Sequence, residues 1–319
     1  MTQPVEAPRF SIAPGPYLWR GRSISQIMYL VVIALLFPTT AAVYFFGLRA
    51  LELIAVSVAS AVITEFLVRK LRGKPFYMDG SAVITGLLLA LTLPPTLPLW
   101  MAAVGSVFAI AIVKEAFGGL GHNIFNPALA ARAFMAASFS IRMTTWVLPM
   151  GFGADAVTTA TPLGESFAWQ GSKLALYWQM FIGNRGGSLG ETSIMLILAG
   201  AILLFAFDII DWRIPLTYIG TVALLALTLR QDIIFQLLAG GLMLGAFFMA
   251  TDYVTSPITP RGQIIFGVGC GAITMLVRAF GGMPEGVTYA ILLMNAVTPL
   301  IDRYVKPRPY GLMKKEKKG

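Results

Sequence analysis

The sequence is poor in the residues that hold metals and disulfides. Cys270 is the single cysteine and His122 the single histidine in 319 residues. One thiol excludes an internal disulfide, and it also excludes an iron–sulfur cluster that needs about four protein ligands. One imidazole argues against a zinc or haem site built from this chain alone. We therefore interpret both residues as structural, and electron transfer through this chain would need an organic cofactor or partner subunits.

Charge is scarce as well. Charged residues make up 12% of the chain, whereas a soluble domain has about 25%. Apolar residues make up 57%, the mean hydropathy is +0.75, and apolar runs long enough to cross a bilayer recur along nearly the whole length. These features exclude a soluble domain and predict an all-α polytopic membrane protein.

We expect about ten transmembrane helices, some of them short or broken. The third and fifth are short for a ~30 Å hydrocarbon core, so we interpret them as half-helices or tilted pieces packed inside the protein. The expected ranges are 25–46, 50–68, 80–93, 99–115, 127–141, 192–208, 214–229, 233–250, 263–278 and 287–301. They divide the chain into an N-terminal segment (1–24), a first membrane repeat (25–141), a loop (142–191), a second membrane repeat (192–301) and a basic tail (302–319).

The net charge of +9 is a topology signal because of where the charges lie. Basic residues cluster before the first span, after the second span and in the tail. An even number of spans puts all three clusters on one side, which the positive-inside rule makes cytoplasmic. The tail can also contact anionic lipid, and nothing in this placement indicates a nucleic-acid partner. The loop 142–191 has three basic residues and is expected to be extracytoplasmic.

An internal repeat supports this arrangement. The sequence AFGG at 116–119 recurs at 279–282, an offset of 163 residues. The same offset relates Pro94 to Pro257 and Thr92 to Thr255. In the expected topology the related positions lie on opposite sides, so we predict two inverted five-helix repeats. Inverted repeats place the working site near their pseudo-twofold axis.

The loop contains the sequence DAVTTATP at 155–162, with three threonines in four residues, small residues between them and a proline after them. One interpretation is a threonine-rich turn, because Thr and Asp beside Pro often mark loops. The other is an acceptor site, since small side chains allow the cleft of a modifying enzyme to close over the backbone and reach one hydroxyl.

Two glycine-rich stretches predict helix starts. In GGLGHNIFNPALAAR at 118–132, Asn126 can cap a helix that begins at Pro127. Such a start inside the membrane suits an anion or the carbonyl edge of a flavin, or it is simply a well-capped half-helix. In GNRGGSLGE at 183–191, Ser188 and Glu191 have the S-x-x-E spacing of a capping box, so we expect a helix to begin there.

Several charged residues lie at or near the ends of expected spans. Charges inside a membrane are functional candidates, although end positions are often merely interfacial. We select Glu115 and Asp252 as ion-path candidates. The full set is Asp79, Lys114, Glu115, Arg132, Asp208, Asp252 and Arg278.

Six stretches, in order and covering most of the chain, resemble one family: the D subunits of Rnf electron-transport complexes, which are related to the B subunit of the sodium-pumping NADH:quinone oxidoreductase. The stretches are 85–95, 121–134, 155–163, 183–193, 250–257 and 284–299. The short N-terminal segment favours the Rnf member of this family.

The resemblance implies cofactors. The heptad at 155–161 is similar to the acceptor motif of flavin transferases, Asp-x-x-Ser/Thr-x-Ala-Thr, in which FMN is esterified through its phosphate to the last threonine. The resemblance implies that FMN is attached to Thr161 and that the transferase recognises Asp155, Thr158 and Ala160. Thr159 departs from the very small residue that is usual there. Arg142, Arg185 or a helix start near Ser188 would meet the charge of the phosphodiester. The resemblance also implies a second flavin, riboflavin, which would lie between the spans; no residues are assigned to it.

The resemblance further implies a subunit of a redox-driven ion translocase of the ferredoxin:NAD oxidoreductase type, coupled to Na⁺ or H⁺ movement, in a bacterial or archaeal cell membrane. The expected partners are the other Rnf membrane, iron–sulfur and flavin subunits, a flavin transferase and lipid. Two alternatives stay open. An inverted-repeat permease or channel would bind no chromophore, and a purely structural subunit would leave Thr161 unmodified.

Overall fold

The computed structural model describes residues 22–149, 158–159, 172–281 and 286–306. The first half of the chain forms α1 (Ile24–Phe46), α2 (Leu48–Leu71), α3 (Ser81–Leu91), α4 (Leu99–Val107), the π-helix η1 (Phe108–Glu115), α5 (Pro127–Ser138) and α6 (Ser140–Met143). Two short strands and a helix follow, β1 (Trp146–Val147), β2 (Thr158–Thr159) and α7 (Lys173–Ile182). The second half forms α8 (Ile194–Ala206), α9 (Arg213–Thr228), α10 (Ile233–Leu238), α11 (Leu242–Leu244), the π-helix η2 (Gly245–Met249), α12 (Pro260–Phe280) and α13 (Gly286–Tyr304).

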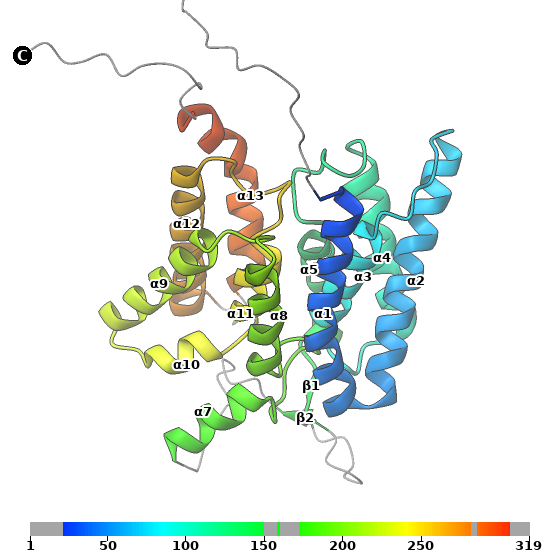
Figure 1. Ribbon diagram of the computed structural model, residues 1–319. Helices are drawn as coiled ribbons and strands as arrows, with labels where there is room; N and C mark the ends of the chain where they lie inside the picture. The colour runs from blue at the N-terminus through cyan, green and yellow to red at the C-terminus, as the bar shows by residue number, and fades with distance from the viewer. Residues whose placement is uncertain (1–21, 150–157, 160–171, 282–285, 307–319) are drawn as a thin grey trace, which may run out of the picture.

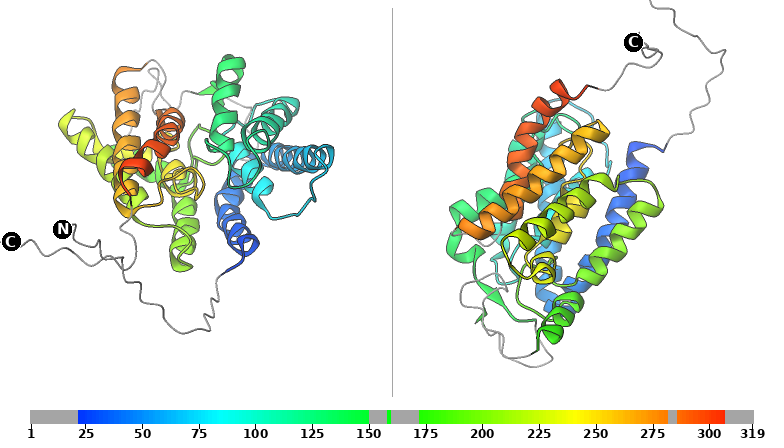
Figure 2. Two further views of the ribbon diagram at one scale, coloured as in Figure 1. Left: turned by 90° about the horizontal axis from the view of Figure 1, so that it is seen from above. Right: turned by 90° about the vertical axis from the view of Figure 1, so that its left-hand side faces the viewer.

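The two halves form two lobes that lie side by side (Figures 1 and 2). In the first lobe α2 packs against α3 and α4, and in the second α12 packs against α9 and α13. Helix α1 packs against α8 where the lobes meet. The start of α1 and the end of α13 lie at one end of the molecule, whereas β1, β2 and α7 lie at the other (Figure 1).

Local sequence sets several helix starts. The side chains of Ser23, Asn126, Ser193 and Thr259 each accept a hydrogen bond from a backbone amide in the first turn of α1, α5, α8 and α12. Pro127 and Pro260 occupy the first helical position, where a missing amide hydrogen costs nothing. The predicted helix start at Asn126–Pro127 is therefore confirmed.

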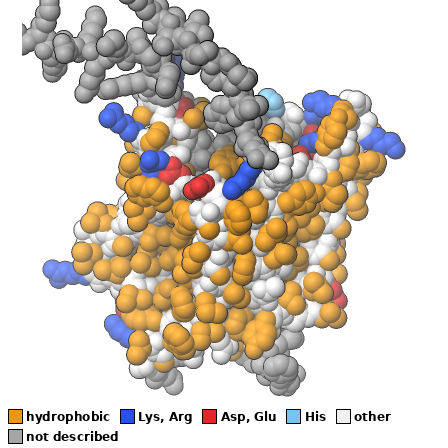
Figure 3. Space-filling view, viewed as in Figure 1, with side chains coloured by type: hydrophobic (Ala, Val, Ile, Leu, Met, Phe, Trp, Pro, Cys, Tyr) orange, Lys and Arg blue, Asp and Glu red, His pale blue; other side chains and the backbone are white. Residues whose placement is uncertain are grey.

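The lateral surface is apolar, and Lys and Arg gather near the ends (Figure 3). Helices α1, α2 and α12 are long and apolar enough to cross a membrane, while α3, α8 and α9 are shorter apolar helices. Close helix contact depends on small residues, as is common in membranes. A Cβ atom on Gly86 of α3 would lie 2.7 Å from Cα of Val58 on α2.

Three features differ from the sequence-based expectation. The span expected at 233–250 is broken into α10, α11 and η2 around Gly240 and Gly241, both with positive φ. The stretch expected as a loop contains α7, and its last residues, 185–191, are buried. The capping box expected at Ser188 was wrong, because α8 begins at Ile194 and its cap is Ser193.

Candidate cofactor cavity and ion-path residues

A cavity opens between the two lobes. The first lobe contributes the start of α1, one face of α3 and the segment 120–127, and the second contributes the end of α8, η2 and residues 251–254. The motifs at 121–134 and 250–257 therefore meet at this one place.

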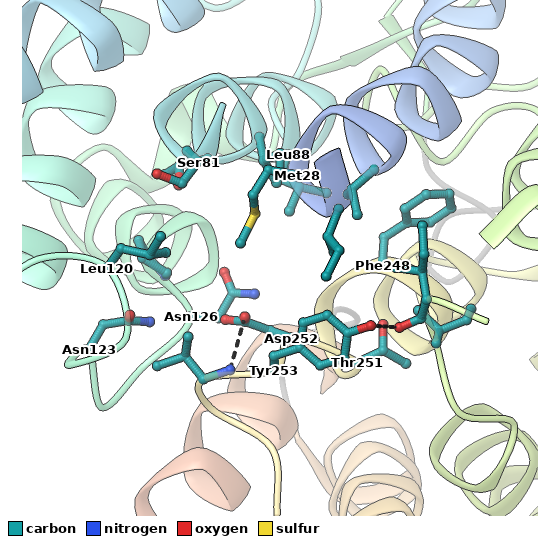
Figure 4. Close-up of a pocket in the computed structure, with 18 of the residues that line it drawn as sticks. Met28, Ser81, Leu88, Leu120, Asn123, Asn126, Phe248, Thr251, Asp252 and Tyr253 are labelled. Atoms are coloured by element: carbon teal, nitrogen blue, oxygen red, sulfur yellow. Dashed lines mark hydrogen bonds between the residues drawn. The ribbon is translucent and has the colours of Figure 1, made fainter. Parts of the chain in front are cut away.

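The cavity has apolar walls and a polar edge. Met28 and Leu88 face Asn126 and Asp252 across the cavity, and Phe248 flanks it (Figure 4). The amide of Asn126 donates to the backbone carbonyl of Met249 at 3.2 Å, and its oxygen accepts from the amides of Ala128 and Leu129. Asn126 therefore both caps α5 and ties α5 to η2.

Asp252, an ion-path candidate from the sequence, lies in the cavity wall. Its carboxylate accepts hydrogen bonds from the amide of Val254 and the hydroxyl of Thr255, each at 3.3 Å. Within the described ranges, no lysine or arginine forms an ion pair with it. Its charge is thus held by neutral donors beside open space, which suits transient cation binding.

The opposite wall contains Lys114 and Ser81, which lead into a buried charge network. The Lys114 ammonium lies 2.8 Å from Oε1 of Glu65 and 2.6 Å from Oγ of Ser81. Glu115, the other ion-path candidate, is only 1% exposed and pairs with Arg69 at 3.2 Å. Glu115 is not among the cavity-lining residues, so the structure brings Asp252 and Lys114 to the cavity and leaves Glu115 behind it.

Sequence reasoning missed Glu65. It lies inside α2 and is 2% exposed, bonded to Lys114 and, at 2.7 Å, to Arg69. A carboxylate within an apolar helix is a signal in itself. It was missed because Arg69 and Lys70 follow so closely that Glu65 reads as part of an interfacial cluster.

A second polar cluster surrounds the break at Gly240 and Gly241. Arg132 pairs with Glu191 at 3.4 Å. Arg278 donates to the carbonyls of Gln236, Ala239 and Gly240 at the end of α10. Arg278 therefore ties the end of α10 and the glycine break to α12.

Arg185 is also buried, at 8% exposure, and donates to the backbone carbonyl of Glu191 at 2.7 Å. Arg142 is exposed on α6. Of the two arginines expected to meet a phosphodiester, Arg142 is thus exposed and Arg185 is buried.

The remaining predicted residues have simpler positions. Thr161, Asp155 and Ala160 lie outside the described residues, whereas Thr158 is in β2, opposite Val147 of β1. Asp79 accepts from Ser81, and Asp208 is exposed at the end of α8. Cys270 is buried in α12 and His122 is exposed. Among the residues that the structure describes, no group of three His, Cys, Asp or Glu side chains is arranged to hold a metal ion.

Comparison with known proteins agrees with the motifs. The profile of the NQR2, RnfD, RnfE family matches residues 11–311. The chain is 48% identical, over 95% of its length and 96% of the relative, to the D subunit of the proton-translocating ferredoxin:NAD(+) oxidoreductase complex of Clostridium ljungdahlii.

It is 49% identical, over 97% of its length and 98% of the relative, to the D subunit of the Na(+)-translocating ferredoxin:NAD(+) oxidoreductase complex of Acetobacterium woodii. It is also 44% identical, over 91% and 92%, to the D subunit of the ion-translocating oxidoreductase complex of Stutzerimonas stutzeri. The resemblance seen in the motifs is thus confirmed across nearly the whole chain, which belongs to the NQR2, RnfD, RnfE family.

Proposed function

We propose that the chain is the D subunit of an ion-translocating ferredoxin:NAD oxidoreductase complex, in which it relays electrons through flavin and contributes to Na⁺ or H⁺ movement. The observation that carries this proposal is the similarity to relatives so named, which extends over nearly all of both chains. Its partners would be the other subunits of such a complex and a flavin transferase, and its location the cell membrane.

The first cofactor we propose is FMN, esterified to Thr161. The described part of the acceptor heptad, Thr158–Thr159, pairs with β1 at the end of the molecule opposite the start of α1 and the end of α13 (Figure 1). This position agrees with cytoplasmic termini and an extracytoplasmic flavin, as the distribution of basic residues predicts. Thr161 would act as an anchor, and exposed Arg142 would meet the phosphodiester charge.

The second cofactor we propose is riboflavin, bound without a covalent bond in the cavity between the lobes. The isoalloxazine ring has apolar faces and a polar edge, and the cavity offers apolar Val31, Ile84 and Leu88 together with polar Asn123, Asn126 and Asp252. When bound, the ring would supply one- and two-electron redox chemistry. The chain would place the ring, exclude water from its faces and set the charge around it.

We also propose that the spans form two inverted repeats of five. The elements recur in order, with α1, α2, α3, α4–η1 and α5 followed by α8, α9, α11–η2, α12 and α13. The offset of 163 residues that relates the AFGG sequences relates these pairs approximately. The cavity and the Gly240–Gly241 break lie at the interface of the two series, which is where transporters with inverted repeats bind ions.

The first experiment tests the covalent flavin. The chain is expressed with a flavin transferase, and the denatured band is examined for flavin fluorescence in wild type, Thr161→Ala and the control Thr159→Gly, which restores the very small residue of the motif. We expect fluorescence in the wild type and the control and none in Thr161→Ala. A wild type without fluorescence, with a known acceptor labelled in parallel, would favour the permease instead.

The second experiment tests the ion path in proteoliposomes that contain the whole complex. Asp252→Asn should reduce ion uptake per electron transferred at least several-fold while electron transfer continues, because its carboxylate faces the cavity without a cationic partner. Glu115→Gln, next to Arg69 and Arg72, should mainly lower stability. Unchanged ion uptake in both variants would place the path elsewhere in the complex.

A further inference from the structure

Lys114 is a buried cation in the wall of the cavity, and local helix geometry puts it there. It lies in the last turn of η1, a π-helix, and is only 2% exposed. Two consecutive charged residues are buried here on different sides, with Lys114 at the cavity and Glu115 against Arg69. π-Helical segments are rare and occur frequently at functional sites.

The carboxylate next to Lys114 does not depend on it. Oε1 of Glu65 lies 2.8 Å from the Lys114 ammonium and 2.7 Å from a guanidinium nitrogen of Arg69. Glu65 would thus keep a cationic partner without Lys114. Arg69 is shared with Glu115, at 3.2 Å, so Lys114 balances part of the negative charge of this network and lines the cavity as well.

The ammonium also has a donor to spare. Of its three N–H groups, one is directed to Glu65 and one to Oγ of Ser81 at 2.6 Å. Ser81 in turn donates to Oδ1 of Asp79 at 2.5 Å. Within the described parts of the chain the third N–H has no hydrogen-bond acceptor, and both Lys114 and Ser81 line the cavity.

We propose that Lys114 is a positioning residue that sets the redox potential of a flavin in this cavity, an inference that rests on the proposed function. The electrons come from redox centres of the partner subunits and enter the ring, and Lys114 keeps its proton throughout. Its spare N–H stabilises the negative charge that the ring gains on reduction. A fixed cation in a water-poor site favours that charge strongly, because screening is weak there.

The test is a redox titration of the noncovalent flavin in the purified complex, followed by absorbance. In Lys114→Met, and in Lys114→Gln as a second neutral variant, the ratio of reduced to oxidised flavin at a fixed potential should fall about ten-fold, which is ~30 mV for a two-electron couple. Lys114→Arg should stay within about three-fold of the wild type. The control Lys70→Met removes an exposed cation of α2 and should leave the ratio unchanged.

The outcomes separate the inference from the proposal beneath it. Flavin bound in both neutral variants with an unchanged ratio would overturn the role of Lys114 and leave the cavity assignment intact. An equal fall in Lys70→Met would also overturn it, since net charge alone would then explain the effect. Two results would overturn the cavity assignment and with it this inference. One is a wild type that contains no noncovalent flavin, and the other is an Ile84→Trp variant that binds as much flavin as the wild type.

Discussion

The side-chain amide of Asn126 donates a hydrogen bond to the backbone carbonyl of Met249, 123 residues further along the chain. The bond joins the start of α5 in the first lobe to the last residue of η2 in the second. Because Asn126 also caps α5 and lines the cavity, one side chain fixes a helix, the contact between lobes and the cavity edge.

Asn126→Ala should therefore destabilise the protein by ~2 kcal/mol, about half from the lost helix cap and half from the lost hydrogen bond to Met249. Asn126→Ser keeps an acceptor for the cap and should lose about half as much. Thermal unfolding in detergent measures both. Equal losses in the two variants would show that the helix cap contributes little, and no loss in Asn126→Ser would show the same for the contact between lobes.

Gly190 should tolerate no side chain. Its amide donates to the carbonyl of Leu91 at 2.6 Å, and an added Cβ would lie 2.6 Å from Cβ of Leu91 and 3.0 Å from its oxygen. We expect Gly190→Ala to cost at least ~2 kcal/mol, since backbone would have to move. The matched control is Gly220→Ala, at an open and exposed helical position, which should stabilise α9 by up to ~1 kcal/mol.

Arg278 should not be replaceable by lysine. Its guanidinium reaches three backbone carbonyls of residues 236–240 and the side-chain oxygen of Gln236, all at 2.7–3.1 Å. An ammonium lacks this planar spread of donors, so Arg278→Lys should destabilise the protein by ~3 kcal/mol and speed proteolysis between α10 and α11. The control Arg213→Lys, at the start of α9, should change stability by less than ~0.5 kcal/mol.

The contact between α7 and α10 should depend on pH. The hydroxyl of Tyr177 donates to Asp232, which raises the pKa of Tyr177 above 10.0 and lowers the pKa of Asp232 below 3.8. The Asp232 contribution is therefore present above pH ~4 and is lost as the pH falls through its folded pKa. The Tyr177 contribution is present below pH ~10 and is lost as the pH rises through its folded pKa.

Hydrogen exchange of the α7 amides, read by mass spectrometry, checks this prediction. Protection should be greatest between about pH 5 and 9 after correction for intrinsic exchange, and Tyr177→Phe should flatten the profile on both sides. Tyr44→Phe, at an exposed ring on α1, is the control. A profile unchanged by Tyr177→Phe would contradict a role for this hydrogen bond.

Much of the architecture was accessible from sequence because it depends on neighbouring residues. The cap at Asn126 and Pro127 needs only the side chain and the first helical turn, so the start of α5 was predicted correctly. The motifs at 121–134 and 250–257 were visible in the sequence, but only the fold shows that residues of both line one cavity.

The capping box at Ser188 failed for a tertiary reason. The amides of Leu189 and Gly190 are bonded to the carbonyls of Leu93 and Leu91, so they are not free to start a helix. The Glu191 carboxylate is directed to Arg132 instead of to Ser188. The residues of the expected capping box thus contact residues about 60–100 positions away in the sequence.

The sequence by itself determined the family and the membrane character, because composition and short motifs express them directly. Tertiary structure alone decided the pairing of Lys114 with Glu65, the burial of Arg185 and the break at Gly240–Gly241. The physical reason is that a buried charge is stable only beside a partner, and sequence spacing does not tell which distant residue supplies that partner.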